Sequence, residues 1–433
     1  MNDESDLVRK SEPLGNDFEY CKNLLWPTLL SQFEFITNTS IKFQLSRGIY
    51  FLNFINRSEY KTYMATFLER KGHKNAVSYF LEITNLIIHL TKISSDGKSI
   101  SSNTKINDPL GLFDQFILEY DVDSGSHKWN TNDLREKPLF RFRDNEFFII
   151  DIGFLVSKLY DGLTFDFYRT SGIEELLTFT RYRSLIGNFT EKNFFRSLFE
   201  KTLAIDFSKN GFENTNESFL GLPDFWGLNG NDLILFEIKD IIFKNEIMES
   251  GNLDRVEEEI KRRISNFEKP KQGLGQQLRV IEDLDSGKIE LEGIPRRNLR
   301  KLKIFPVLIH SNHFLEMPGV NVLVYNEFMN ALNKVTLVNI KKNNIQPPTI
   351  IHLEYFIEDY PTIRFVRNGR FKNELKAYTS KLKRVDQNGF ISRSPNKIYT
   401  NSYESFGALM GIKGKQSTFS NFVKMFFERQ MFE

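Results

Sequence analysis

Residues 221–240 read GLPDFWGLNGNDLILFEIKD, and this stretch predicts a β-hairpin that carries charged side chains. Asn229-Gly230 is a strong hairpin signal, because both residues tolerate a positive φ angle. It separates two predicted strands, roughly 223–228 and 233–239. Side chains alternate along a strand, so Glu237 and Lys239 share one face of the second strand. Together with Asp224 they place three charges in an otherwise apolar hairpin, where an unpaired charge is expensive.

Two strand registers fit this hairpin. With a loop of residues 229–232, Asp224 lies directly opposite Glu237, at a Cβ separation of about 4.5–5.5 Å. With a loop of Asn229-Gly230 alone, Asp224 opposes Leu235, and Glu237 is a diagonal neighbour at about 7–8 Å. Both registers put the three charged side chains on one face of the hairpin.

Two carboxylates this close repel each other unless a positive group lies between them. Mg²⁺ prefers hard oxygen ligands and needs only one or two carboxylates from the protein, and Lys239 adds a compact positive charge. A metal held in this way can polarise a phosphate oxygen and generate hydroxide from bound water. The three residue types therefore predict hydrolysis of a phosphodiester bond.

Pro223-Asp224, twelve residues and then Glu237-Ile238-Lys239 resemble the motif of the PD-(D/E)XK nuclease superfamily. The resemblance covers about residues 185–335. It implies an α/β fold with a restriction-endonuclease-like core, a central mixed β-sheet flanked by helices. It also implies a Mg²⁺-dependent endonuclease, in which Mn²⁺ can substitute. Asp224 and Glu237 would be the metal ligands, and Lys239 would polarise the attacking water.

The family usually supplies a further glutamate from a helix before the hairpin, and TEKNFFRSLFEKTLAI (190–205) is the predicted helix here. We favour Glu191 as the auxiliary catalytic residue and metal ligand, because it lies on the apolar side of this helix. Glu200, on the opposite side, stays an alternative. A further helix, GLGQQLRVIEDL (273–284), resembles a Gln-x-x-x-Tyr helix motif of the family at Gln277, although Ile281 replaces the tyrosine. We therefore expect Gln277 to belong to the site.

Two histidines follow the hairpin, His310 and His313, at the end of the predicted strand KIFPVLIH (303–310). The chain has one cysteine and offers no clear partner ligands in sequence, so we expect a strand end on the surface and no metal site. NVLVYN (321–326) is predicted as one more strand.

Composition indicates a globular chain of 433 residues with 40 % hydrophobic residues and 42 phenylalanines. We expect a mainly helical N-terminal region (1–135), a nuclease domain (136–345) and a basic, helical C-terminal region (346–433). Residues 361–433 hold 14 Lys and Arg against 5 Asp and Glu, a charge balance that suits a polyanion. Basic runs at 296–303 and 364–397 are candidates for phosphate contacts.

The sequence shows no signal peptide or membrane span, so we expect a cytoplasmic protein without a membrane partner. We expect a nuclease acting on double-stranded DNA in bacterial restriction or anti-phage defence, with residues 1–135 available for a homo-oligomer or a partner protein. The alternatives are an RNA-cleaving nuclease, a non-catalytic nucleic-acid-binding subunit, and a nuclease that stays inactive until a partner or ligand binds.

Overall fold

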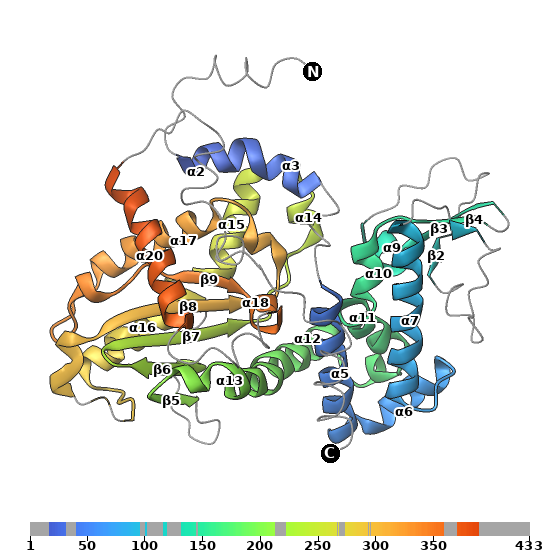
Figure 1. Cartoon of the computed structure of the whole chain (residues 1–433), viewed down its shortest axis with the longest axis horizontal. Coiled ribbons are helices and arrows are strands. Elements are labelled where there is room, and N and C mark those ends of the chain that lie inside the picture. The colour runs from blue at the N-terminus through green and yellow to red at the C-terminus, as the bar shows by residue number, and fades with distance from the viewer. Residues whose placement is uncertain are drawn as a thin grey trace, which may run out of the picture. The chain divides into compact units, whose positions relative to one another are not determined.

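The computed structural model describes residues 17–31, 40–95, 100–101, 116–118, 131–143, 146–212, 222–265, 267, 273–292, 294, 296–358 and 370–388. The chain forms two compact units (Figure 1). One comprises the described residues within Met1–Gln32 and Leu198–Gly414, and we call it the sheet unit. The other comprises those within Phe33–Ser197, and we call it the helix-rich unit.

The sheet unit is built on a five-stranded mixed sheet in the order β5-β6-β7-β8-β9. β5, β6 and β7 are antiparallel neighbours, whereas β7, β8 and β9 run parallel to one another. The strands are β5 (Lys209–Phe212), β6 (Phe225–Asn229), β7 (Asp232–Lys239), β8 (Lys303–His310) and β9 (Thr349–His352). The sheet confirms an α/β fold, and the predicted strand at 303–310 is confirmed as β8.

The β6–β7 hairpin has the first of the two predicted registers. Leu228 pairs with Leu233 and Asn229 with Asp232, so the turn itself is Gly230-Asn231. Gly230 has a φ of +64°, which a glycine adopts without a Cβ penalty. The last pair at the other end is Phe225 with Phe236. One residue further along, the same register sets Asp224 opposite Glu237.

One face of this sheet is packed with aromatic rings. The rings of Phe225 and Phe236 lie 5.4 Å apart, and Phe199 of α13 (Arg196–Thr202) lies 4.9 Å from both. Phe371 of α20 (Arg370–Asn388) stacks on Phe236 at 5.9 Å. Aromatic rings in such contacts contribute heavily to core stability. Because side chains alternate on β7, Glu237 and Lys239 project from the opposite face.

The remaining helices of the sheet unit surround the sheet. Asn252 caps α15, because its side chain accepts a hydrogen bond from the Arg255 N–H. α16 packs against β7 and β8. These elements are α14 (Asn245–Met248), α15 (Leu253–Ile264), α16 (Gly273–Ser286), α17 (Val320–Lys334), α18 (Glu354–Glu358), and the short turns η5 (Ala204–Asp206), η6 (Arg296–Lys301), η7 (His313–Glu316) and η8 (Lys342–Asn344).

An N-terminal segment belongs to the sheet unit as well. It consists of α2 (Asp17–Tyr20), η1 (Cys21–Leu25) and α3 (Trp26–Ser31), and Figure 1 shows α2 and α3 beside α15. Lys22 Nζ lies 2.5 Å from Asp254 and 2.6 Å from Glu257, both on α15. The Trp26 indole N–H donates to the Pro318 carbonyl at 2.8 Å. These contacts fix residues 17–31 to the sheet unit.

The helix-rich unit contains helices and a small four-stranded sheet, in the order β1-β4-β3-β2. Its buried Phe51 ring contacts the rings of Tyr160, Phe167 and Phe189. The elements are α5 (Ile41–Arg57), α6 (Lys61–Arg70), α7 (Ala76–Ser95), β1 (Ile100–Ser101), β2 (Ile117–Leu118), α9 (Thr131–Glu136), β3 (Leu139–Arg143), β4 (Glu146–Ile149), α10 (Ile152–Ser157), α11 (Asp161–Thr170), η3 (Ile173–Glu175), α12 (Phe179–Asn188) and the π-helical η4 (Phe189–Phe195), which runs into α13.

One predicted strand is wrong, and the units divide the chain at positions other than the expected boundaries. Residues 321–326 lie in helix α17, where buried Val320, Val324, Phe328 and Leu332 recur every four residues on one helical face. The five-stranded sheet extends beyond residue 345 to β9, and residues 146–197 group with the helix-rich unit.

The hydropathy of the described helices shows whether any of them could cross a membrane. None of the described helices combines the length and apolarity that a bilayer crossing requires.

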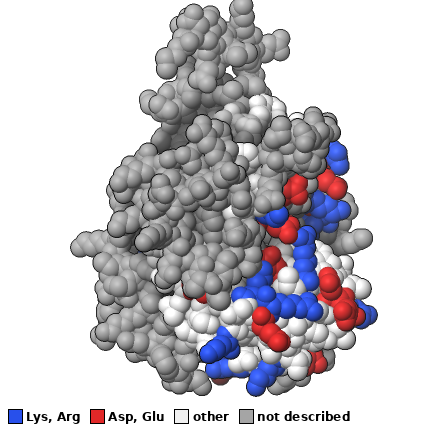
Figure 2. All heavy atoms as spheres, turned by 90° about the vertical axis from the view of Figure 1, so that its right-hand side faces the viewer, with Lys and Arg blue, Asp and Glu red and all other residues white. Residues whose placement is uncertain are grey.

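In Figure 2, Lys and Arg side chains lie interspersed with Asp and Glu over the described part of the visible face. Mixed charge of this kind gives that part of the surface no single-sign field.

Candidate functional site

Asp224 immediately precedes β6 and is half-buried. The Ile238 N–H of β7 donates a hydrogen bond of 2.7 Å to its Oδ2. The Asp224 side chain therefore adds one hydrogen bond between the strands beyond their last residue pair, Phe225 and Phe236. This bond fixes the Asp224 carboxylate beside the peptide that joins Glu237 to Ile238.

Glu237 and Lys239 form an ion pair on β7. The side chain of Glu237 is 0 % exposed, and its Oε1 lies 2.7 Å from Lys239 Nζ. Lys239 keeps 21 % of its side chain exposed, so its ammonium group connects the buried carboxylate to the surface. A buried carboxylate is tolerated only with a close positive partner. The lysine accounts for how this strand accommodates a charge in the core.

The neighbouring parallel strands extend this polar group across the sheet. Lys239 pairs with His310 of β8, and His310 pairs with His352 of β9. Paired residues of neighbouring strands point to the same face. Lys239, His310 and His352 therefore form a row at the carboxyl ends of β7, β8 and β9, on the same face as Glu237. Ligands of open α/β sheets bind outside these strand ends.

Gln277 of α16 is fully buried and ties the helix to the sheet. Its Nε2 donates to the carbonyl of Leu235 in β7 at 3.0 Å and to that of Val307 in β8 at 2.7 Å. Its Oε1 is buried without a hydrogen-bond partner among the described residues. Gln277 thus links β7 and β8, the strands that carry Glu237, Lys239 and His310. Its two acceptors precede Glu237 by two residues and His310 by three.

The two glutamate candidates lie in different parts of the chain. Glu191 is half-buried in η4 of the helix-rich unit, and Glu200 is exposed on α13 within the sheet unit. The sequence predicted a helix beginning near Thr190, whereas the helical run begins at Phe179 with Thr178 as its N-cap. Asp224, Glu237, Lys239 and Gln277 belong to one unit, and Glu191 belongs to the other.

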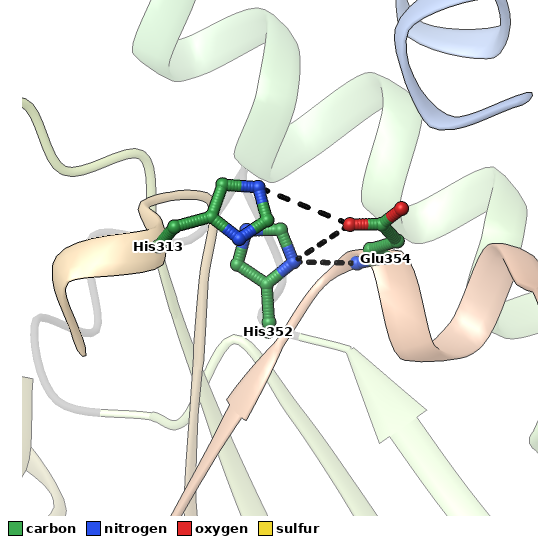
Figure 3. A group of neighbouring side chains, drawn as sticks. All are labelled: His313, His352 and Glu354. Atoms are coloured by element: carbon green, nitrogen blue, oxygen red, sulfur yellow. Dashed lines mark hydrogen bonds and ion pairs between the residues drawn. The ribbon is translucent and has the colours of Figure 1, made fainter. Parts of the chain in front are cut away.

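The expected surface position is wrong for His310. His310 is 1 % exposed rather than at the surface, and its Nε2 lies 3.3 Å from Glu316 Oε1. His313 of η7, His352 of β9 and Glu354 at the start of α18 gather nearby (Figure 3). Their ligand atoms all lie within 4.8 Å of one another. The only sequence signal was the pattern His352-x-Glu354 after an apolar strand, which becomes informative once β8 and β9 are known to be neighbours.

Some lysines of the predicted basic run 364–397 form contacts within the sheet unit. Lys372 and Lys376 of α20 lie 3.5 Å and 2.7 Å from Asp232 at the start of β7. Lys383 donates to the Gln346 side chain at 2.8 Å, and burial together with nearby Lys303 lowers its pKa. Residues 364–369 and 389–397 of the same predicted run lie outside the described residues. Lys372 and Lys376 therefore attach α20 to β7, and Lys383 attaches it to Gln346.

Comparison of the chain with protein-family models, with curated proteins and with solved structures finds no match. The site is therefore interpreted from its own residues.

Proposed function

We propose that this protein is a metal-dependent nuclease, with a site formed by Asp224, Glu237 and Lys239 on the β6–β7 hairpin. The observation that carries the proposal is the 2.7 Å contact between buried Glu237 and Lys239, beside the peptide N–H that holds the Asp224 carboxylate. Two acidic groups opposite each other and one lysine match the residue types that the PD-(D/E)XK resemblance requires. A mixed sheet flanked by helices is also the architecture that this resemblance implies.

The donor set fits Mg²⁺. Asp224 and Glu237 offer carboxylate oxygens, the ligand type that Mg²⁺ prefers, and one or two such groups suffice. Burial of the Glu237 carboxylate favours positive charge beside it, and Lys239 supplies one such charge at 2.7 Å. Mg²⁺ or Mn²⁺ bound there would polarise a phosphate oxygen and lower the pKa of a bound water.

The chain's own residues divide the remaining work. The Ile238 N–H orients the Asp224 carboxylate, so this ligand is positioned before substrate arrives. Lys239, which reaches the surface, can donate hydrogen bonds to a water or to a phosphate oxygen while it balances Glu237. Gln277 keeps β7 and β8 in register behind these groups. Double-stranded DNA is the proposed substrate, in bacterial restriction or anti-phage defence.

The test is cleavage by the purified full chain, with Mg²⁺, with Mn²⁺ and with a chelator, on plasmid DNA, single-stranded DNA and RNA. We expect metal-dependent cleavage of plasmid DNA, and its loss in Asp224→Asn, Glu237→Gln and Lys239→Arg. Lys239→Arg keeps a cation beside Glu237 but replaces a compact ammonium group with a planar guanidinium.

The matched control is Asp232→Asn, a carboxylate at the far end of the same strand that binds lysines of α20. It should cleave like the unaltered chain. Wild-type rates in all three site variants would refute the assignment of the site. Cleavage of RNA in place of DNA would keep the site and replace the substrate.

A further inference from the structure

A second polar cluster lies at the carboxyl ends of β8 and β9. His313 comes from η7, just after β8, His352 is the last residue of β9, and Glu354 begins α18. Figure 3 shows one nitrogen of each imidazole ring directed at the same carboxylate oxygen of Glu354. The three side chains are partly or fully buried, with 18 %, 6 % and 13 % of their surface exposed. This cluster is not needed by the proposed nuclease site.

The separations in this cluster are those of ligands around an ion. Glu354 Oε2 lies 3.9 Å from His313 Nε2 and 3.7 Å from His352 Nδ1. Both distances exceed the 3.2 Å or so that a direct hydrogen bond allows. Ligand atoms about 2.0–2.1 Å from a tetrahedral ion lie roughly 3.3 Å apart. A small inward movement of these side chains would therefore satisfy coordination.

The orientation of His352 points the same way. The backbone N–H of Glu354 donates to His352 Nδ1 at 3.2 Å, so the lone pair of this nitrogen is directed into the cluster, and a metal bound through Nδ1 would replace this hydrogen bond. The same nitrogen faces the Glu354 carboxylate oxygen, which is also an acceptor. The His313 ring stacks on His352 with centroids 4.1 Å apart. Two imidazoles and a carboxylate gathered in a largely buried place can share a cation.

We propose that His313, His352 and Glu354 bind a divalent first-row transition metal such as Zn²⁺. Two imidazoles and one carboxylate suit this class of ion, whereas Mg²⁺ prefers oxygen ligands alone. Three protein ligands leave a coordination position for water, as in catalytic zinc sites. His310, whose ring lies 5.3 Å from that of His352, and its neighbour Glu316 flank the ligands. Such flanking groups orient metal-binding histidines.

The site stands apart from the hairpin carboxylates. β9 lies two strands from β7, a distance of about 10 Å at the usual strand spacing. The inference does not depend on nuclease activity, because its ligands come from η7, β9 and α18. From the sequence we expected no metal site at His313, because no partner ligands were clear. The structure brings His352 and Glu354 to it as candidate partners.

The experiment uses the full chain without a histidine tag, stripped with chelator and titrated with Zn²⁺ by calorimetry. With excess Mg²⁺ present to occupy the hairpin carboxylates, we expect one Zn²⁺ per chain, and an affinity at least about 100-fold weaker in His313→Gln and in Glu354→Gln. His73→Gln is the matched control, because His73 is a buried histidine 3.8 Å from Glu82 in the helix-rich unit. Asp232→Asn, the control variant of the nuclease test, should also leave Zn²⁺ binding unchanged. The titration measures metal binding without cleavage, so it separates this test from that of the nuclease.

A second readout covers variants that fail to fold. Co²⁺ added to the stripped wild-type chain should give visible absorption bands of a nitrogen- and oxygen-bound ion, and Zn²⁺ should remove them. Absence of these bands, absence of Zn²⁺ binding, or equal Zn²⁺ affinity in the wild-type chain and in folded His313→Gln and Glu354→Gln would overturn the proposal.

Discussion

Asp224 has two separable roles in this account, and two substitutions distinguish them. Its Oδ2 accepts the Ile238 N–H at 2.7 Å, and its negative charge is proposed to bind the metal. Asp224→Ala removes both the acceptor and the charge. Asp224→Asn removes the charge but keeps a carbonyl oxygen that can accept the same N–H.

The structural loss can be estimated from this hydrogen bond. A hydrogen bond to a charged group contributes about 1.5–3 kcal/mol, and one between neutral groups about 0.5–1.5 kcal/mol. Since Asp224 is half-buried, we expect Asp224→Ala to cost about 2 kcal/mol and Asp224→Asn about 1 kcal/mol. For a unit of this size, 1 kcal/mol corresponds to about 2–4 °C in Tm. Asp224→Ala should thus lower Tm by about 4–8 °C, twice the effect of Asp224→Asn.

Hydrogen exchange locates the effect. A peptide spanning 233–239 reports the Ile238 amide, which should exchange faster in Asp224→Ala and close to the wild-type rate in Asp224→Asn. Both variants should lose cleavage by about 100-fold or more, because both lack the ligand charge. Equal destabilisation and equal exchange in the two variants would refute the role given to the hydrogen bond. Wild-type cleavage by folded Asp224→Asn would refute the role given to the charge.

Further predictions concern the scaffold and its response to pH. Gln277→Met removes two buried hydrogen bonds and should cost about 2 kcal/mol of unfolding free energy, measured by thermal denaturation. Gly227→Ala should cost about 1–3 kcal/mol in the same assay, because its Cβ would lie 2.5 Å from the Phe207 ring. Gly187→Ala, with open space around the new Cβ, is the matched control and should not lower Tm. Burial raises the pKa of Glu257, but hydrogen bonds from two lysines outweigh this and hold its pKa below the ordinary 4.5. Its stabilisation is then fully present above the ordinary carboxyl pKa and is lost as the pH falls below it, through the lowered pKa of Glu257. Glu257→Gln should flatten the fall of Tm over that interval, and an unchanged pH profile would contradict this assignment.

The hairpin could be read from the sequence because every cue is local. Asn229-Gly230 predicts the turn to within one residue, and strict alternation assigns Glu237 and Lys239 to one face. The local cues did not distinguish the two possible strand registers. In the structure Leu228 pairs with Leu233, which is the first of them. The α16 helix was likewise predictable from its apolar periodicity, and strand β8 from its short continuous apolar run.

Long-range pairing defeated the other predictions. His313 and His352 meet only because β8 and β9 run parallel, and no local pattern reveals that neighbour relation. His310 reads as a polar strand end, but adjacent β9 and η7 bury it. The apolar run at 321–326 is too short to distinguish a strand from a buried helix. The division at Leu198 falls inside a helical run, where composition gives no boundary signal.

The most direct test of the central claim is anomalous diffraction from crystals of the full chain soaked in Mn²⁺. The account predicts a peak within ligand distance of both the Asp224 and Glu237 carboxylates, and its loss in Asp224→Asn. Mn²⁺ peaks only elsewhere, with these two carboxylates turned away from each other, would contradict it.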